Sequence, residues 1–207
     1  MLYALAFSIA CFFIFSYEKT AINLYVNSFV GNPAANSFFY FITYLGDGRL
    51  AALILLIILT YNVRYGIYAT FSFLSATIVS NSLKYFFFDD VNRPFYVYQY
   101  IERHDLNLVE GVDLHIHNSF PSGHATQAFA ILMCLAFVSG RPGTKMFFFF
   151  IALLTSLSRV YLSQHWLVDI TAGSLIGIFF SLLFYYVFIH RNKFLKLDRP
   201  LFTLRSR

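Results

Sequence analysis

The chain has 207 residues, of which 58% are hydrophobic and 21% aromatic, while only 12% are charged. Soluble domains carry about 25% charged residues, so this composition excludes an ordinary soluble protein and predicts an all-α protein with several membrane helices. The two cysteines both lie in apolar runs, which excludes a disulfide framework and a cysteine metal site. A net charge of +5 can indicate a nucleic-acid partner, but its distribution along the chain argues against that class.

The first part of the chain alternates apolar and more polar segments. Leu2 to Phe15 is apolar and starts without Lys or Arg, so it predicts a short, uncleaved membrane helix. The more polar stretch from Glu18 to Asn36 predicts an interfacial segment, which can continue through Phe38 to Leu45. After the turn signal Gly46-Asp47-Gly48, the run from Leu50 to Tyr61 is apolar but shorter than the ~20 residues of a span, so this helix must include flanking residues.

The next apolar run, Tyr65 to Phe88, is long enough for a complete span. Its polar residues include Thr70, Thr77, Asn81 and Lys84. Their spacing of 7, 4 and 3 residues predicts one helical stripe that faces the other helices instead of lipid. Asp89 to Phe120 follows as the only long polar segment, and a loop of this length is usually functional or disordered.

Three further helices complete the predicted bundle: Ser122 to Ser139, Lys145 to Leu162, and Trp166 to Ile189. Trp166 is predicted to be an interfacial aromatic anchor. Gly173 and Gly177 form a G-x-x-x-G pattern, which predicts close packing against a neighbouring helix. Because no linker or repeat separates the helices, we interpret residues 1–207 as a single domain with six membrane helices.

The charges predict an orientation. If the helices alternate, both termini and the turns at residues 62–65 and 140–145 share one side, which then carries nine basic residues and one acid. The nine are Arg64, Arg141, Lys145, Arg191, Lys193, Lys196, Arg199, Arg205 and Arg207. The basic excess, which includes a tail at 190–207, predicts the cytoplasmic side. The positive charge therefore predicts membrane lipids as a partner and does not indicate nucleic acid.

Residues suited to phosphate chemistry lie at the opposite ends of these helices. They are Lys84, Arg93, Ser122, Gly123, His124, Arg159, His165 and Asp169. The three cations can neutralise a transferring phosphoryl group, and a Pro-Ser-Gly sequence at a helix start is an anion site with outward N–H groups. The two histidines can supply a nucleophile and an acid, and Asp169 lies four residues after His165, where it can hold the imidazole.

The order of these residues resembles the type 2 phosphatidic acid phosphatase family, which shares its site with vanadium haloperoxidases. The family pattern is Lys, then Arg-Pro, then Pro-Ser-Gly-His, then Ser-Arg-x5-His-x3-Asp. This chain has Lys84, Arg93-Pro94, Pro121-Ser122-Gly123-His124 and Ser158-Arg159-x5-His165-x3-Asp169, so a core at 84–169 carries the resemblance. One departure is the eight residues between Lys84 and Arg93, where the family usually has six. Two of these residues, Asp89 and Asp90, are predicted to face water or to pair with a cation.

The resemblance implies a role for each site residue. His165 attacks phosphorus to form a phosphohistidine, Asp169 orients His165, and His124 protonates the leaving oxygen and then activates water. The residues that hold the phosphate are Lys84, Arg93, Ser122, Gly123 and Arg159. His115 and His117 could be metal ligands, but a position in the loop or at the substrate rim is favoured. Because the three cations already neutralise the phosphate, we expect no metal and no cofactor.

These features predict a metal-independent integral membrane lipid phosphatase. We expect it in the inner (cytoplasmic) membrane, with cytoplasmic termini and the site on the periplasmic or outer face. Phosphatidic acid, phosphatidylglycerol phosphate, undecaprenyl diphosphate and lipid A all stay open as the lipid phosphate substrate. The main alternative is a lipid phosphotransferase that passes the phosphoryl group to an acceptor alcohol or lipid. A non-catalytic binder or transporter is less favoured, because binding would need only the cations.

Overall fold

The computed structural model describes residues 1–191 and 194–202, and every regular element in these ranges is helical. The helices are α1 (Leu2–Ser16), α2 (Lys19–Asn27), α3 (Pro33–Ile42), α4 (Gly48–Tyr61), α5 (Val63–Phe86), α6 (Pro94–Tyr96), α7 (Gly123–Val138), α8 (Pro142–Tyr161) and α9 (Leu167–Phe184). Short helical turns are η1 (Thr43–Gly46), η2 (Val97–Glu102), η3 (Tyr185–His190) and η4 (Leu195–Leu197). The predicted all-α class is confirmed.

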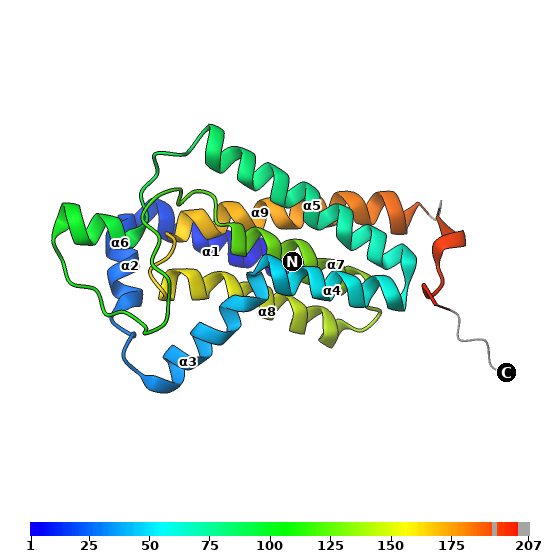
Figure 1. Cartoon of the computed structure of the whole chain (residues 1–207), viewed down its shortest axis with the longest axis horizontal. Coiled ribbons are helices and arrows are strands. Elements are labelled where there is room, and N and C mark those ends of the chain that lie inside the picture. Colours follow the sequence, from blue (N-terminus) through cyan, green and yellow to red (C-terminus); the bar gives the residue numbers. More distant parts are fainter. Residues whose placement is uncertain (192–193, 203–207) are drawn as a thin grey trace.

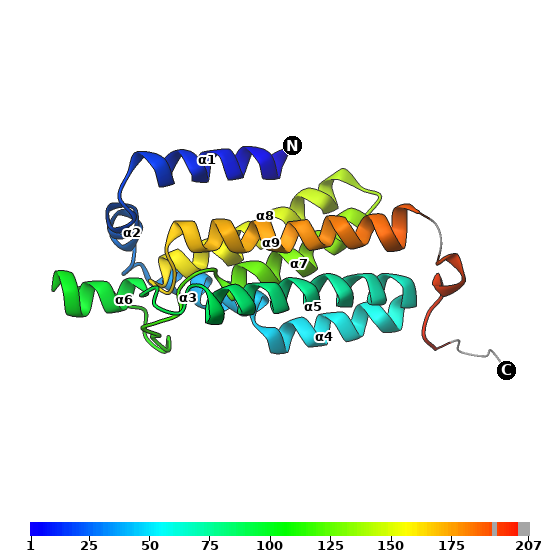
Figure 2. The same ribbon diagram turned by 90° about the horizontal axis from the view of Figure 1, so that it is seen from above.

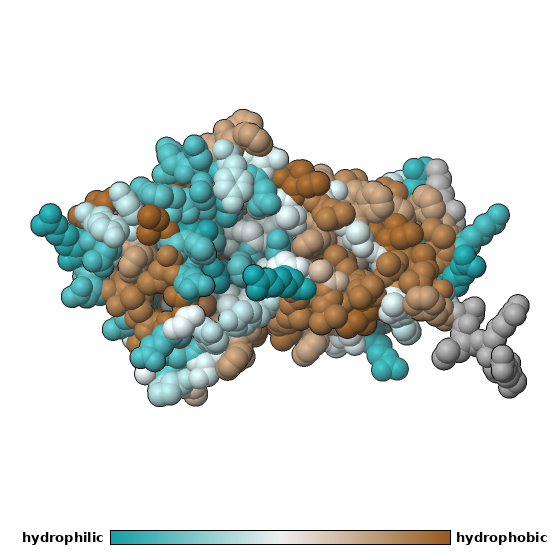
Figure 3. Space-filling view, viewed as in Figure 1, coloured by the Kyte–Doolittle hydropathy of each residue, from teal (hydrophilic) through white to brown (hydrophobic). Residues whose placement is uncertain are grey.

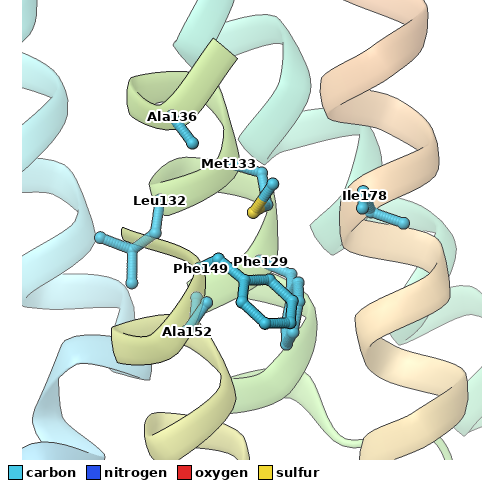
Figure 4. Packing of buried hydrophobic residues seen from close by; sticks show 8 residues of the cluster. Phe129, Leu132, Met133, Ala136, Phe149, Ala152 and Ile178 are labelled. Atoms are coloured by element: carbon cyan, nitrogen blue, oxygen red, sulfur yellow. The ribbon is translucent and has the colours of Figure 1, made fainter. Parts of the chain in front are cut away.

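Helix α7 forms the centre of the bundle, surrounded by α4, α5, α8 and α9 (Figures 1 and 2). Its sequence is apolar on nearly all sides, as expected of a helix that is enclosed by others. Figure 4 shows Phe129 and Met133 of α7 beside Phe149 of α8, with Ile178 of α9 on the opposite side. This core holds together the helices that carry the last two motifs of the sequence.

The two glycines of α9 allow it to lie directly against α7. A Cβ added at Gly173 would lie 2.5 Å from the carbonyl oxygen of Ser122, and one at Gly177 would lie 2.5 Å from that of Thr126. Any side chain there would force the helices apart, so the close packing predicted from the G-x-x-x-G pattern is confirmed.

The predicted inward stripe of α5 is wrong in one respect. Asn81 is exposed, whereas Ser72, Ala76, Ser80 and Lys84 are buried against the other helices. Residues four apart form a nearly straight row on a helix, and this row carries the small side chains that α7 and α9 approach. Lys84 belongs both to the predicted stripe and to this buried row, so its predicted inward position is correct.

Within the described residues, two helices are long and apolar enough to cross a membrane: α8, and α9 continued by η3. Two bent pairs would raise this number to four if each were one span: α1 with α2, bent by 113°, and α3–η1 with α4, bent by 59°. Helix α7 is apolar but shorter. Figure 3 shows hydrophobic side chains over much of the helical part and hydrophilic ones gathered over the loop-bearing left end. The count of six spans stays a prediction.

The two ends of the bundle have different contents. The loops and helix ends that carry the motifs lie at the left of Figure 1, together with α2, α3 and α6. The α4–α5 and α7–α8 turns and the end of η3 lie at the right, and these carry Arg64, Arg141, Lys145 and Arg191. Lys193, Arg205 and Arg207 of the predicted basic side lie outside the described residues. Which end faces the cytoplasm stays a prediction.

Candidate active site

Five separate segments bring the predicted site residues to one end of the bundle (Figure 1). Lys84 lies in the last turn of α5, and Arg93 directly precedes α6. Ser122 caps α7, and Arg159 lies in the last turn of α8. His165 lies just before α9, and Asp169 lies in the first turn of that helix. The charges of Arg93, Lys84, Arg159 and His124 all act on His165, so the structure brings the predicted residues together.

His165 is held between an acidic and a basic side chain. Its Nδ1 lies 3.2 Å from Oδ2 of Asp169, and its Nε2 lies 3.3 Å from Nη1 of Arg93. Because a guanidinium can only donate, Nε2 must accept, and the proton of the neutral ring is on Nδ1, directed at Asp169. This tautomer leaves the lone pair of Nε2 on the side of the cations, where a nucleophile would need it.

The same surroundings keep His165 uncharged. Its side chain is only 2% exposed, and burial lowers the pKa of His165 well below its usual 6.5. The positive charges of Arg93, Lys84 and Arg159 lower this pKa further. The imidazole is therefore neutral and available for attack at neutral pH.

Arg93 is oriented by neutral acceptors. Its Nε donates to the carbonyl oxygen of His117 at 2.8 Å, Nη1 to that of Gln164 at 3.1 Å, and Nη2 to that of Asn118 at 3.3 Å. Asp169 lies near enough to act on its charge but forms no ion pair with it. The guanidinium is thus fixed in place while its positive charge stays uncompensated by a salt bridge.

Arg159 is held in the same way. Its Nη1 donates to Oγ1 of Thr43 at 2.8 Å, and its Nη2 to Oε1 of Gln164 at 3.4 Å. The Nε atom is buried and has no hydrogen-bond partner among the described residues. A buried arginine with neutral partners and an unused donor is suited to bind an anion that enters the site.

The Pro-Ser-Gly sequence forms the start of α7, as predicted. The side chain of Ser122 accepts the N–H of Ala125 at 3.5 Å, and its own N–H donates to the carbonyl oxygen of Asp169 at 3.0 Å. This second bond joins the Pro-Ser-Gly-His motif to the last motif. A Cβ added at Gly123 would meet no atom within 4 Å, so there is open space beside the first N–H groups of the helix.

The long polar loop folds back so that Arg93 reaches the site. The N–H of Arg93 donates to the carbonyl oxygen of Ile116, and that of Ser119 to the carbonyl oxygen of Val91, both at 2.9 Å. Asp89 and Asp90, which belong to the longer segment between Lys84 and Arg93, are exposed and form no ion pair in the described part of the chain. Of the two predictions for these aspartates, the one that turns them toward water is correct.

Sequence reasoning missed three residues of the site. Ser119 is fully buried and donates its hydroxyl to Oδ2 of Asp169, which also accepts the N–H of Trp166 at 2.9 Å. Gln164 and Thr43 hold Arg159. The only available signal was position: Ser119 is two residues before Pro121, and Gln164 precedes His165.

The prediction for Trp166 is wrong. This side chain is 1% exposed and is not an interfacial anchor, because its Nε1 donates to the carbonyl oxygen of Asn92 at 2.9 Å inside the protein. Its ring packs beside Tyr98 of η2. Trp166 thus connects the segment that carries Arg93 to the start of α9.

The two loop histidines occupy the edge of the site. His117 is bonded through Nδ1 to Oδ1 of Asn92 at 2.8 Å and lies against the ring of Tyr96. His115 is exposed, and burial of part of its ring together with the charges of Arg93 and Arg159 lowers its pKa. In the described part of the chain, no group of three or more His, Cys, Asp or Glu residues could hold a metal ion.

A helical membrane bundle whose polar end combines three cations with two histidines is typical of a phosphoryl-transfer protein. Residues 65–193 match the PAP2 superfamily, so the chain belongs to this family. The resemblance noted in the sequence is confirmed.

Two solved structures and one curated relative resemble the chain. LpxE from Aquifex aeolicus has a TM-score of 0.69 and 26% identity, with 80% of this chain and 93% of that one covered. A PAP2-type phosphatidylglycerolphosphate phosphatase from Bacillus subtilis has a TM-score of 0.66 and 21% identity, with 93% and 96% covered, and supports the fold. The lipid A 1-phosphatase of Porphyromonas gingivalis is 35% identical over 72 residues, which are 34% of this chain and 16% of that protein. The match thus spans about a sixth of that relative's length.

Proposed function

We propose that this protein is a membrane lipid phosphatase that removes a phosphate group through a phosphohistidine intermediate. The observation that carries this proposal is the position of His165, with Nδ1 on Asp169 and Nε2 3.3 Å from Nη1 of Arg93, a buried arginine that forms no ion pair among the described residues. A site built only to bind phosphate would need the cations, but it would not need a neutral histidine oriented by a carboxylate.

In the first step, Nε2 of His165 attacks the phosphorus atom and forms the P–N bond as the P–O bond to the lipid breaks. His124 gives a proton to the departing lipid oxygen, and the lipid alcohol leaves. His124 then removes a proton from a water molecule, whose oxygen attacks phosphorus and breaks the P–N bond. Inorganic phosphate leaves, and His165 returns to its neutral state.

The phosphate-binding residues stabilise the charge that develops on the oxygens of the phosphoryl group. Arg93 and Arg159 supply donors held in fixed directions, and Lys84 adds a third positive charge. The open space at Gly123 admits an oxygen beside the helix start, where Ser122 can donate its hydroxyl. Because these groups already neutralise the phosphate, the proposed reaction needs no metal ion.

Lipid A 1-phosphate is the first substrate that we propose to test. The curated relative is a lipid A 1-phosphatase, and LpxE is the structural neighbour with the higher sequence identity of the two. Phosphatidic acid, phosphatidylglycerol phosphate and undecaprenyl diphosphate are the other substrates to compare. We further propose one domain with six spans in the inner membrane, and a site on its outer face.

The test is phosphate release from these four lipids in detergent or liposomes, with excess EDTA, by the native chain and by His165→Ala. Release by the native chain alone is the expected result, and the preferred lipid identifies the substrate. Restoration of activity only by a divalent ion would contradict metal independence. Phosphorylated acceptor lipids without free phosphate would instead indicate a phosphotransferase. Trapping of ³²P on the native chain, absent from His165→Ala, tests the covalent intermediate.

A further inference from the structure

The short turn η1 lies outside the region that matches the family, yet it touches two helices of the site. It joins α3 to α4 and comprises Thr43 to Gly46, whereas the family match begins at residue 65. Thr43 and Gly46 are both buried within the bundle. Their contacts reach Arg159 at the end of α8 and His124 at the start of α7.

Thr43 makes the shorter of the two hydrogen bonds that hold the guanidinium of Arg159. The distance from Nη1 to Oγ1 of Thr43 is 2.8 Å, whereas that from Nη2 to Oε1 of Gln164 is 3.4 Å. An arginine side chain has several rotatable bonds, so a short bond at its tip restricts it strongly. A hydroxyl is also neutral, and it fixes the guanidinium without cancelling the charge that a phosphate would bind.

Gly46 lies against the backbone of His124. A Cβ added at Gly46 would lie 2.7 Å from the carbonyl oxygen of His124 and 2.9 Å from its Cβ. Real Cβ atoms do not come so close to backbone, so any side chain at residue 46 would displace His124. The direction of the imidazole follows from the position of its Cβ, and a small displacement would move its ring nitrogens relative to the substrate.

We propose that η1 is a positioning element of the active site. Thr43 aims Arg159 at the phosphate, and the missing side chain of Gly46 lets His124 stand where it can protonate the leaving oxygen. Neither residue touches the substrate, so each acts through the residue it contacts. This inference rests on the proposed function, because it assigns a task to the phosphate-binding arginine and to the proton donor.

For Thr43, the decisive comparison is between Thr43→Val, Thr43→Ser and the control Thr155→Val. Thr155 is a buried threonine of α8 whose hydroxyl bonds only to the carbonyl oxygen of Ile151 in its own helix. In Thr43→Val we expect kcat/KM to fall about tenfold and inorganic phosphate to inhibit about tenfold more weakly, the size of one lost hydrogen bond to a charged group. Thr43→Ser should restore both values to within about twofold, and Thr155→Val should match the native chain.

For Gly46, the comparison is Gly46→Ala against Gly48→Ala. A Cβ at Gly48 would meet only the side chain of Gln127, at 3.8 Å, which is an ordinary contact. The variants are assayed with an alkyl phosphate and a nitrophenyl phosphate that carry the same hydrocarbon chain. Nitrophenolate leaves without a proton, so loss of the proton donor should slow the alkyl substrate about 100-fold and the aryl substrate only slightly. Gly48→Ala should slow neither.

Two outcomes would overturn the proposal. One is equal phosphate inhibition in Thr43→Val and Thr155→Val, with both proteins folded as judged by thermal unfolding in detergent. The other is an equal loss for both leaving groups in Gly46→Ala. If Thr43→Val does not fold, phosphate inhibition of Thr43→Ala decides in the same way. An inactive native chain would instead contradict the proposed function, so the two failures are distinguishable.

Discussion

Buried arginines occupy both ends of this bundle, but they have different partners. Arg64, at the end opposite the site, is 4% exposed and donates to the carbonyl oxygens of Phe188 and Ile189. It also forms an ion pair with Asp198 at 3.4 Å. Arg93 and Arg159 are 8% and 7% exposed, nearly as buried, and neither forms an ion pair in the described part of the chain.

The presence or absence of an ion pair distinguishes Arg64, whose charge is structural, from Arg93 and Arg159, whose charges can serve an incoming anion. Arg64 caps the carbonyl groups at the end of the last long helix, and Asp198 compensates its charge. A buried arginine without a carboxylate partner is costly to the free protein, and the cost is recovered when an anion binds. Arg93 and Arg159 are therefore suited to the phosphate-binding role that we propose, while Arg64 joins the start of α5 to η3 and to Asp198.

The largest expected effect comes from replacing the proposed nucleophile or a proposed phosphate-binding arginine. Arg159→Ala and His165→Ala should each reduce kcat/KM about 1,000-fold or more, because groups that stabilise the transferring phosphoryl group or attack it are lost. Arg159→Ala should cost less stability than Arg64→Ala, since it also removes an uncompensated buried charge. Initial rates and thermal unfolding in detergent provide the measurement. Near-normal turnover in folded His165→Ala would contradict the histidine mechanism.

Gly123→Ala tests the open space at the start of α7. Apart from its chain neighbours and the nearby backbone of its own helix, no atom lies within 4 Å of the new methyl group, so the melting temperature should not change. Activity should fall about 10- to 100-fold, because the methyl group occupies space that a phosphate oxygen needs beside the helix N–H groups. Gly177→Ala is the contrasting variant: it should lower the melting temperature, because its Cβ would collide with α7. Unchanged kinetics in Gly123→Ala would place the phosphate elsewhere.

Arg64→Ala tests the structural role of the arginine at the opposite end of the bundle. It removes the donors to two carbonyl oxygens and the partner of Asp198, and should cost about 1–3 kcal/mol of stability. Turnover per folded molecule should stay unchanged, because Arg64 lies in the first turn of α5, whereas Lys84 of the candidate site lies in the last turn of this 24-residue helix. Denaturation and activity are measured on the same detergent preparation. A specific loss of kcat with unchanged stability would refute the structural role.

The smallest expected effect is a shift in pH dependence. In the proposed mechanism neutral His165 is the reactive form. Burial and the charges of three cations lower the pKa of His165 well below 6.5, so its nucleophilicity should be lost only as pH falls through that lower value. Lys84→Gln removes one of these cations and should raise the pKa of His165, which moves the acid limb of kcat/KM to higher pH. Profiles of the native and variant proteins give the comparison. An unmoved limb would mean that Lys84 does not act on the nucleophile.

The local sequence pattern was sufficient to predict much of this structure. Apolar runs predicted the long helices, and the glycines four apart predicted close packing of α9 against a neighbouring helix. The alternation of the helices predicted that the motif residues meet at one end. Each of these features depends on helix periodicity and chain direction, which are properties of neighbouring residues. The inward position predicted for Lys84 is correct despite the two extra residues, because it depends on the face of α5 and not on the loop that follows.

Contacts between segments far apart in the sequence decided which side chains hold the site residues and which residues are buried. Thr43 is 116 residues from Arg159 and Ser119 is 50 from Asp169, and no local pattern marks a threonine or serine as the partner of a particular side chain. The burial of Trp166 and the exposure of Asn81 likewise depend on which surfaces neighbouring elements cover. The candidate reactive groups could be identified from residue type and spacing, whereas the neutral groups that hold them became visible only when the helices were packed together.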